Sequence, residues 1–311
     1  MHKIPVADVV VANRNRTDTF IESLDNLKGF SRNRDRIIIM DCSDSPSSEY
    51  KKLTSFFEYS DFGGQGDIDL RFFARKSWGF DHGARLDYLS LLDNGKLDTP
   101  RLTFFMQDHY MNQDAFVNSD TLPGGQQIDL DSCRKLLDLN NQQVLFNSRY
   151  GFRISASNPS LNPLFSNMST QSGSENISFL IDGTNMILDP RYLLKYFSDN
   201  PEMLTSGDGT YAFAVAWETR ISKILYDQGL TFNELSRGIS VDSIEKLLAI
   251  YPLPCDTWCF YYHLTTAFEI YGKDIYRYPG QWKWYWHPKV IGERLKRFLA
   301  PIDRTVVEID E

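Results

Sequence analysis

Residues 102–109 read LTFFMQDH, an apolar run that ends in an amide, a carboxylate and an imidazole. Three earlier runs have a similar form, and polar residues follow each of them: DVVVA at 8–12, RIIIM at 36–40 and LRFFA at 70–74. Short runs rich in β-branched and aromatic residues, bounded by polar residues, are typical of buried strands. Because ligands bind at the carboxyl ends of the strands in an open α/β sheet, the residues after these runs predict a ligand-binding edge.

Helical patterns separate the four predicted strands. Thr17 and Asp18 predict the cap of a helix that continues to Leu27, and Pro46 is placed to open the next helix. A third helix is expected over 82–92, where leucines recur at helical spacing. The alternation predicts an α/β fold of the Rossmann type, with a mixed, mostly parallel sheet flanked by helices.

The second half of the chain is less regular. Residues 155–176 are rich in Ser, Asn, Pro and Gly, which suits either an active-site flap or a disordered insertion. A strand pair is expected at 177–181 and 185–188, and a helix after Pro190. A strong helix is predicted over about 210–228, and the chain from about 236 onward has a helical, aromatic pattern.

Composition excludes several classes of protein. The 311 residues carry a formal net charge of -8, which argues against binding nucleic acid by general electrostatics. Four cysteines do not make a disulfide framework in a chain of this length. Neither a secretory leader nor a run of about 20 apolar residues is evident, so we expect a cytoplasmic protein.

The order of the strand-end motifs resembles that of GT-A glycosyltransferases, most closely the large family-2 group, over residues 5–235. The resemblance rests on NRNR at 13–16, DCSDS at 41–45, GFDHGAR at 79–85 and QDH at 107–109. It implies a nucleotide-sugar-binding fold in which these motifs surround the donor.

The same resemblance implies a division of the chain. Residues 1–235 would form a GT-A-like catalytic domain, with a nucleotide-binding half at 1–110 and an acceptor half at 111–235. Residues 236–311 would form a helical, aromatic-rich C-terminal extension.

The family pattern also implies which residues hold the nucleotide-sugar. The expected donor-binding residues are Asn13, Arg14, Arg16, Asp41, Ser43, Gly79, His82, Arg85 and Gln107. A carboxylate at Asp41 suits the imide of a uracil ring, although it would also suit a turn or helix cap. Arginines suit phosphate, and at least one of the three is expected to be an ordinary surface charge.

A metal site is implied at the end of the fourth strand. Asp108 is a hard oxygen ligand for Mn²⁺ or Mg²⁺, which would bridge the donor's diphosphate. The family motif has two acids, whereas this chain has one acid followed by His109. His109 would ligate Mn²⁺, or the enzyme would work without metal; a polar strand end with no such role is the remaining alternative.

The general base is implied at Asp208, within Ser206-Gly207-Asp208-Gly209. An acid in this place would take the proton from the acceptor hydroxyl as its oxygen attacks the anomeric carbon. The same residues are ordinary turn chemistry, so a turn or helix cap is the alternative.

These expectations combine into one function. The chain would transfer a sugar, with a UDP-sugar favoured as donor, to a hydroxyl of a glycan or lipid-linked acceptor in surface polysaccharide synthesis. The reaction would be inverting and metal-assisted. The run WKWYW at 282–286 suits sugar stacking, a membrane interface or a partner surface, and we favour a lid or acceptor wall. Peripheral association with the inner face of the membrane agrees with this reading.

Two alternatives remain open. A nucleotidyltransferase also has acids at strand ends, but its first turn is rich in glycine and lysine, and residues 13–16 contain neither. A degenerate, non-catalytic binding module of the same fold is supported by the missing second acid at 107–109.

Overall fold

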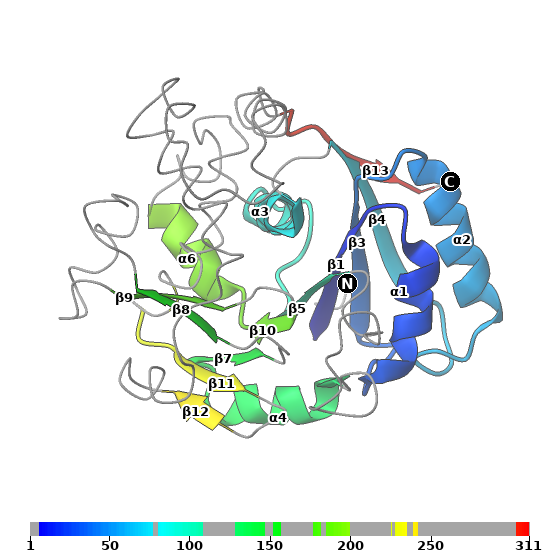
Figure 1. Cartoon of the computed structure of the whole chain (residues 1–311). Coiled ribbons are helices and arrows are strands. Elements are labelled where there is room, and N and C mark those ends of the chain that lie inside the picture. Colours follow the sequence, from blue (N-terminus) through cyan, green and yellow to red (C-terminus); the bar gives the residue numbers. More distant parts are fainter. Residues whose placement is uncertain are drawn as a thin grey trace, which may run out of the picture.

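The computed structural model describes ten parts of the chain: residues 6–76, 80–107, 128–146, 152–156, 177–181, 185–199, 225, 228–234, 239–241 and 303–310. They form a sheet with helices on both faces (Figure 1). Among the described residues, no helix is both long and apolar enough to cross a membrane.

The main sheet has nine strands. Their spatial order is β12 (Ile239–Val241), β11 (Thr231–Glu234), β7 (Gln143–Phe146), β10 (Asn185–Leu188), β5 (Leu102–Gln107), β1 (Ala7–Asn13), β3 (Asp35–Asp41), β4 (Asp69–Arg75) and β13 (Val306–Ile309). Strands β10, β12 and β13 run against the other six, which all point the same way. The predicted mixed, mostly parallel α/β sheet is therefore confirmed.

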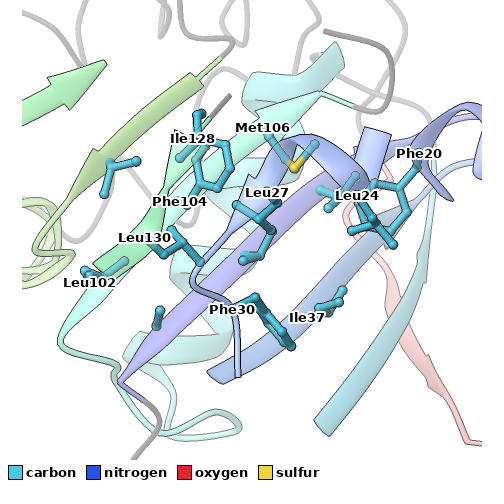
Figure 2. Packing of buried hydrophobic residues seen from close by; sticks show 14 of the residues in the cluster. Phe20, Leu24, Leu27, Phe30, Ile37, Leu102, Phe104, Met106, Ile128 and Leu130 are labelled. Carbon is cyan, nitrogen blue, oxygen red and sulfur yellow. The ribbon is translucent and has the colours of Figure 1, made fainter. Parts of the chain in front are cut away.

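Alternation along the strands gives the sheet two buried faces. In β1, Val9 and Val11 pack on one face and Val10 packs on the other, because successive strand side chains point in opposite directions. One face is covered by α1 (Thr17–Ser23), α2 (Pro46–Tyr59) and α4 (Leu130–Leu139), and the other by α3 (Phe80–Asp93) and α6 (Arg191–Asp199). Figure 2 shows the core on the face that α1, α2 and α4 cover. There Phe104 and Met106 of β5 pack in the same cluster as Phe20 of α1 and Leu130 of α4.

The first helix is shorter than predicted. Helix α1 starts at Thr17 with Arg16 in the capping position, and after Ser23 the chain continues as a 3₁₀ turn over Leu24–Asn26. Residues Leu27–Lys28 then form β2, which pairs in parallel with β6 (Ile128–Asp129). Leu24 and Leu27 are buried as the pattern predicted, but pairing with β6 ends the helix early.

Residues 177–181 and 185–188 are both strands, but the prediction that they pair with each other is wrong. Strand β9 (Ile177–Ile181) pairs with β8 (Phe152–Ala156) in a separate sheet, whereas β10 inserts between β5 and β7. In β10, Met186 and Ile187 are both buried, one on each face, as suits a central strand. The sequence pattern predicts that a segment is a strand, but it does not select the partner.

The described parts of the expected helical extension are strands. Strands β12 and β13 lie at the two edges of the main sheet, and residues 242–302 are outside the described residues. Strand β13 pairs with β4, and Arg71 of β4 forms an ion pair with Glu308. This final strand therefore completes the same sheet as the first strand of the chain.

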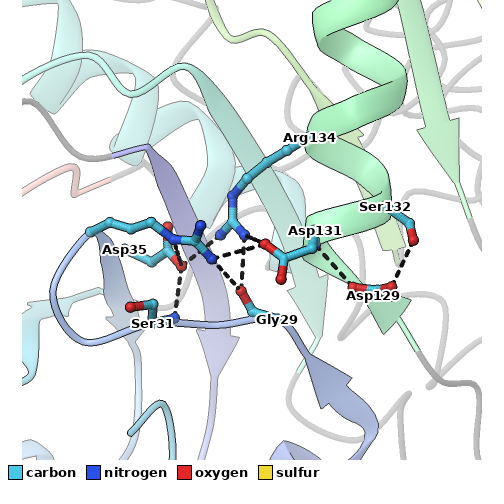
Figure 3. Close-up of polar contacts among 8 residues, drawn as sticks. Gly29, Ser31, Asp35, Asp129, Asp131, Ser132 and Arg134 are labelled. Carbon is cyan, nitrogen blue, oxygen red and sulfur yellow. Dashed lines mark hydrogen bonds and ion pairs between the residues drawn. The ribbon is translucent and has the colours of Figure 1, made fainter. Parts of the chain in front are cut away.

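Hydrogen bonds join the turn between β2 and β3 to the first residues of α4 (Figure 3). Arg134 of α4 donates to the carbonyl of Gly29 at 2.9 Å, to Asp131 at 2.6 Å and to buried Asp35 at 2.6 Å. Asp35 also accepts from the amide of Ser31 at 2.8 Å. Burial raises the pKa of Asp35, and the facing guanidinium of Arg134 opposes that rise.

We expect Gly29→Ala to destabilise the protein more than Gly95→Ala, by about 1–3 kcal/mol, the usual range for overpacking. Both glycines have φ of +71°, so a side chain costs similar backbone strain at each. A Cβ on Gly29 would lie 2.8 Å from the amide nitrogen of Asp131, whereas a Cβ on Gly95 meets nothing within 4 Å. Urea unfolding of both variants measures the difference, and equal losses would contradict the close approach at Gly29.

Candidate functional site

The carboxyl ends of β1 and β5 lie at a reversal in the strand order. Strand β3 lies on one side of β1 and β5 lies on the other. Helix α1, which follows β1, packs on one face of the sheet, and α3, which precedes β5, packs on the opposite face. Such a reversal is the topological switch point where open α/β sheets bind their ligands.

Three predicted donor-binding residues meet at this edge: Asn13, Asp41 and Ser43, here called the strand-end cluster. Asn13 ends β1, Asp41 ends β3, and the two are paired in register. Asn13 Nδ2 donates to Asp41 Oδ1 at 2.6 Å, and Ser43 Oγ donates to the same oxygen at 2.6 Å. The Ser43 amide donates to Asp41 Oδ2 at 3.1 Å. The sequence predicted these three residues, and the structure brings them together.

The two polar atoms of the Asn13 side-chain amide differ in their hydrogen bonding. Besides Asp41, its Nδ2 has Thr17 Oγ1 at 3.2 Å and Ser43 Oγ at 3.5 Å. Its Oδ1 is buried and accepts no hydrogen bond from any residue that the structure describes. A buried acceptor without a donor is uncommon, and such groups call for an explanation.

Asp41 is enclosed by its neighbours. The side chain is fully buried, and burial raises the pKa of its carboxyl group. Hydrogen bonds from Ser43 and Asn13 act in the opposite direction, because they favour the charged form. The carboxylate thus fixes the orientation of Asn13 and Ser43, and its predicted contact with a uracil imide stays a prediction.

The turn after β1 is held in an unusual backbone conformation. Asn15 has φ of 57°, in the left-handed region, and its amide donates to Ser43 Oγ at 2.6 Å. Its side chain exchanges hydrogen bonds with Asp44, each at 3.0 Å. Sequence reasoning did not single out Asn15, although asparagine is one of the few residues that adopt this conformation readily. Strained backbone of this kind clusters at functional sites.

The predicted arginines are in different environments. Arg14 and Arg16 are exposed in the turn that follows β1. Arg85 is buried in α3 with its guanidinium 5.5 Å from the centre of the Phe105 ring, which indicates a packing role. Contact of any of the three with phosphate stays a prediction.

The structure describes little of the remaining predicted site residues. His82 lies in α3 and Gln107 ends β5 beside Ala12, but the structure describes only the backbone of both. The others lie outside the described residues: Gly79, Asp108, His109 and Asp208. Within the described part of the chain, no three His, Cys, Asp or Glu side chains gather as metal ligands would.

A cavity of about 670 Å³ lies at the opposite edge of the sheet. It is bounded by Val6 and Leu102 near the starts of β1 and β5, by the end of α4, and by Asp189 and Arg191 after β10. None of the predicted site residues that the structure describes lines it. We therefore place the candidate site at the strand-end cluster of β1 and β3, which contains the buried acceptor and lies beside the switch point between β1 and β5.

No protein-family model and no curated protein matches the chain. Solved structures that match in part include the mannosyltransferase PcManGT from Pyrobaculum calidifontis, in complex with GDP-Man and Mn²⁺, at 12% identity and a TM-score of 0.43, covering 96% of this chain and 71% of that one. The glycosyltransferase GlyE of Streptococcus pneumoniae has 12% identity and a TM-score of 0.37, with 75% and 46% coverage. The bifunctional enzyme WbbM has 13% identity and a TM-score of 0.36, with 76% and 39% coverage.

All three of these structures are of glycosyltransferases. At TM-scores below 0.5 and identities near 12%, the match does not by itself establish a shared fold or activity. The α/β assignment rests instead on the strand order and directions of this chain.

Proposed function

We propose that this protein is a glycosyltransferase that binds a nucleotide-sugar at the carboxyl ends of β1, β3 and β5. The strand-end cluster carries the proposal, because it gathers polar side chains at the ends of β1 and β3, beside the switch point of a mixed α/β sheet. The motif order supports the same reading, since QDH at 107–109 follows the third of these strands.

The reaction we propose is transfer of a sugar to an acceptor hydroxyl. The acceptor oxygen bonds to the anomeric carbon as the bond from that carbon to the diphosphate oxygen breaks, with inversion at that carbon. Asp208 accepts the hydroxyl proton, and the nucleoside diphosphate leaves. Asp108 and His109 would hold a Mn²⁺ or Mg²⁺ ion, which supplies positive charge to the diphosphate when bound.

The donor and acceptor follow from the resemblance. We propose a UDP-sugar as donor and a glycan or lipid-linked acceptor in surface polysaccharide synthesis. Trp282, Trp284 and Trp286 would form a lid or acceptor wall, because indole rings stack on sugars and suit a membrane interface. Work at the cytoplasmic face of the membrane is part of this proposal.

We expect UDP to stabilise the wild-type protein and Mn²⁺ to increase the effect. A ligand that binds only the native state stabilises it by about 2.7 kcal/mol at 100 times its Kd. Thermal unfolding with UDP, GDP, ADP and CDP, each with and without Mn²⁺, measures this. Asp108→Ala should abolish the metal-dependent part of the shift, and His109→Ala should reduce it less.

Asp44→Ala is the control variant, since Asp44 is an exposed acid in the turn after β3 and belongs to neither proposed metal position. If no nucleoside diphosphate shifts the wild-type transition at millimolar concentration, the donor site is wrong. Full metal-dependent stabilisation of Asp108→Ala would reject the metal assignment alone. Nucleotide binding without any sugar transfer would favour the non-catalytic binding module.

A further inference from the structure

Arg304, just before β13, contacts the helix that follows β4. Its guanidinium forms an ion pair with Asp87 of α3 at 3.3 Å. We propose that Arg304 is a positioning residue for the donor site: through Asp87 it holds α3, and with it the start of that helix at the ligand-binding edge of the sheet. The inference rests on the proposed function, and it gives the segment that leads into β13 a part in donor binding.

Asp87 is a buried carboxylate that two arginines share. Arg75, the last residue of β4, donates from Nε to Asp87 Oδ2 at 2.8 Å. Arg304 donates from Nη2 and Nε to the other oxygen, Oδ1, at 3.3 and 3.4 Å. The Asp87 side chain is 2% exposed, and a charge so deeply buried needs compensating charge beside it. The two arginines therefore fix where α3 lies against β4 and against the residues before β13.

Helix α3 starts at the edge of the sheet that carries the candidate site. Strand β4 pairs in parallel with β3, so both strands end at this edge, and only residues 76–79 separate β4 from Phe80 at the start of α3. Asp87 follows Phe80 by about two helical turns. The predicted donor-binding residues His82 and Arg85 lie between these two points. Because a helix moves as a rigid element, a shift at Asp87 reaches the first turn of α3.

Other residues of α3 contact the centre of the sheet. Tyr88 donates to Asp8 of β1 at 2.8 Å, and the Arg85 guanidinium lies 5.5 Å from the ring centre of Phe105 in β5. Asp87 instead holds α3 on the side of β4 and β13. The side chain of Arg304 is 25% exposed, and its loss leaves Asp87 paired with a second arginine. Arg304 can therefore be replaced without leaving a buried charge uncompensated.

Strand β13 provides a matched control. Its Glu308 forms an ion pair with Arg71 of β4, and both side chains are partly exposed. This pair joins β13 to β4 but does not involve α3. Arg71→Ala and Arg304→Ala thus each remove one partly exposed ion pair of residues 303–310, and of these two pairs only that of Arg304 contacts α3.

The test measures amide hydrogen exchange in α3 and the affinity for UDP in the same variants. Arg304→Ala should increase exchange of the α3 amides by about 10-fold, the scale of one lost hydrogen-bonded contact to a charged group. It should weaken UDP binding, measured by isothermal titration, by about fivefold or more, because α3 is less well positioned. Arg304→Lys, which keeps the charge, should restore most of both properties. Arg71→Ala should leave both within about twofold of the wild-type values.

Three outcomes would overturn the inference and leave the proposed function intact. The first is unchanged exchange of the α3 amides in Arg304→Ala. The second is faster exchange without weaker UDP binding, since α3 would then not position the donor site. The third is an equal effect of Arg71→Ala, which would assign the effect to docking of β13 and not to the contact with Asp87. Absence of UDP binding by the wild-type protein would instead reject the UDP donor and the positioning role together.

Discussion

Asp208→Asn should reduce the rate of sugar transfer by about 100-fold or more while leaving nucleotide binding near normal. The substitution keeps the shape of the side chain and much of its ability to cap a helix, but it removes the base that accepts the acceptor's proton. Loss of general-base catalysis typically costs about 100-fold to 10,000-fold. The position of the acid, after a glycine-containing turn and before a predicted helix, motivates the choice.

Turnover and nucleotide titration on one preparation separate the two effects. Asp93→Asn is the control, because it changes an exposed acid at the end of α3 that is not a candidate for the base. Undiminished transfer by Asp208→Asn would move the base to another acid, with Glu218 and Asp182 as the next candidates. A parallel loss of nucleotide binding would instead indicate that Asp208 supports the fold of the site.

The second large effect concerns stability. We expect Asp8→Ala to lower the free energy of unfolding by about 3–5 kcal/mol, the cost of leaving a buried partner charge uncompensated. Arg36 donates to both oxygens of Asp8, at 2.9 and 2.7 Å, and Tyr88 donates to one of them at 2.8 Å. Asp8 is 0% exposed and Arg36 is 4% exposed, so water cannot replace the lost carboxylate.

An exposed ion pair provides the control. Asp18 is paired with Lys52 at 3.1 Å, and its side chain is 75% exposed. Exposed pairs contribute about 0–1 kcal/mol, so Asp18→Ala should have a small effect in the same urea titration. Similar losses for the two variants would contradict the importance of the buried network.

The same network explains why the burial of Asp8 is tolerated. Burial raises the pKa of the Asp8 carboxyl, and the hydrogen bonds and charge of Arg36 oppose that rise. Tyr88 also contacts Thr103 at 3.0 Å, so the network joins β1, β3, α3 and β5 beneath the switch point. It fixes the four elements that carry the candidate site.

Much of the fold of residues 6–107 was predictable from the sequence. The runs at 8–12, 36–40, 70–74 and 102–106 are strands, as their apolar patterns predicted, although in 70–74 only Phe72 and Phe73 are buried. Pro46 opens α2, because a proline at the first helical position loses no hydrogen bond. Polar residues at the ends of these runs predicted the strand-end cluster, since parallel strands bring their carboxyl ends to one edge.

Pairing between distant segments was not predictable. Strand β10 joins β5 and β7 instead of pairing with β9, and β13 at the end of the chain pairs with β4. Local patterns describe which faces of a segment are buried, but many strands satisfy the same pattern. The choice among them depends on packing of the whole sheet.

The sequence by itself determined the α/β class and the presence of Asn13, Asp41 and Ser43 at strand ends, because hydrophobic periodicity and polar strand ends are local properties. Only the tertiary structure decided which hydrogen bonds form among these three side chains. Burial and a 2.6 Å contact with Asp41 fix the Asn13 side-chain nitrogen, and within the described part of the chain the side-chain oxygen has no donor. Hydrogen bonding of this kind depends on distances and orientations between β1 and β3, which lie 28 residues apart at this contact and meet only when the sheet is formed.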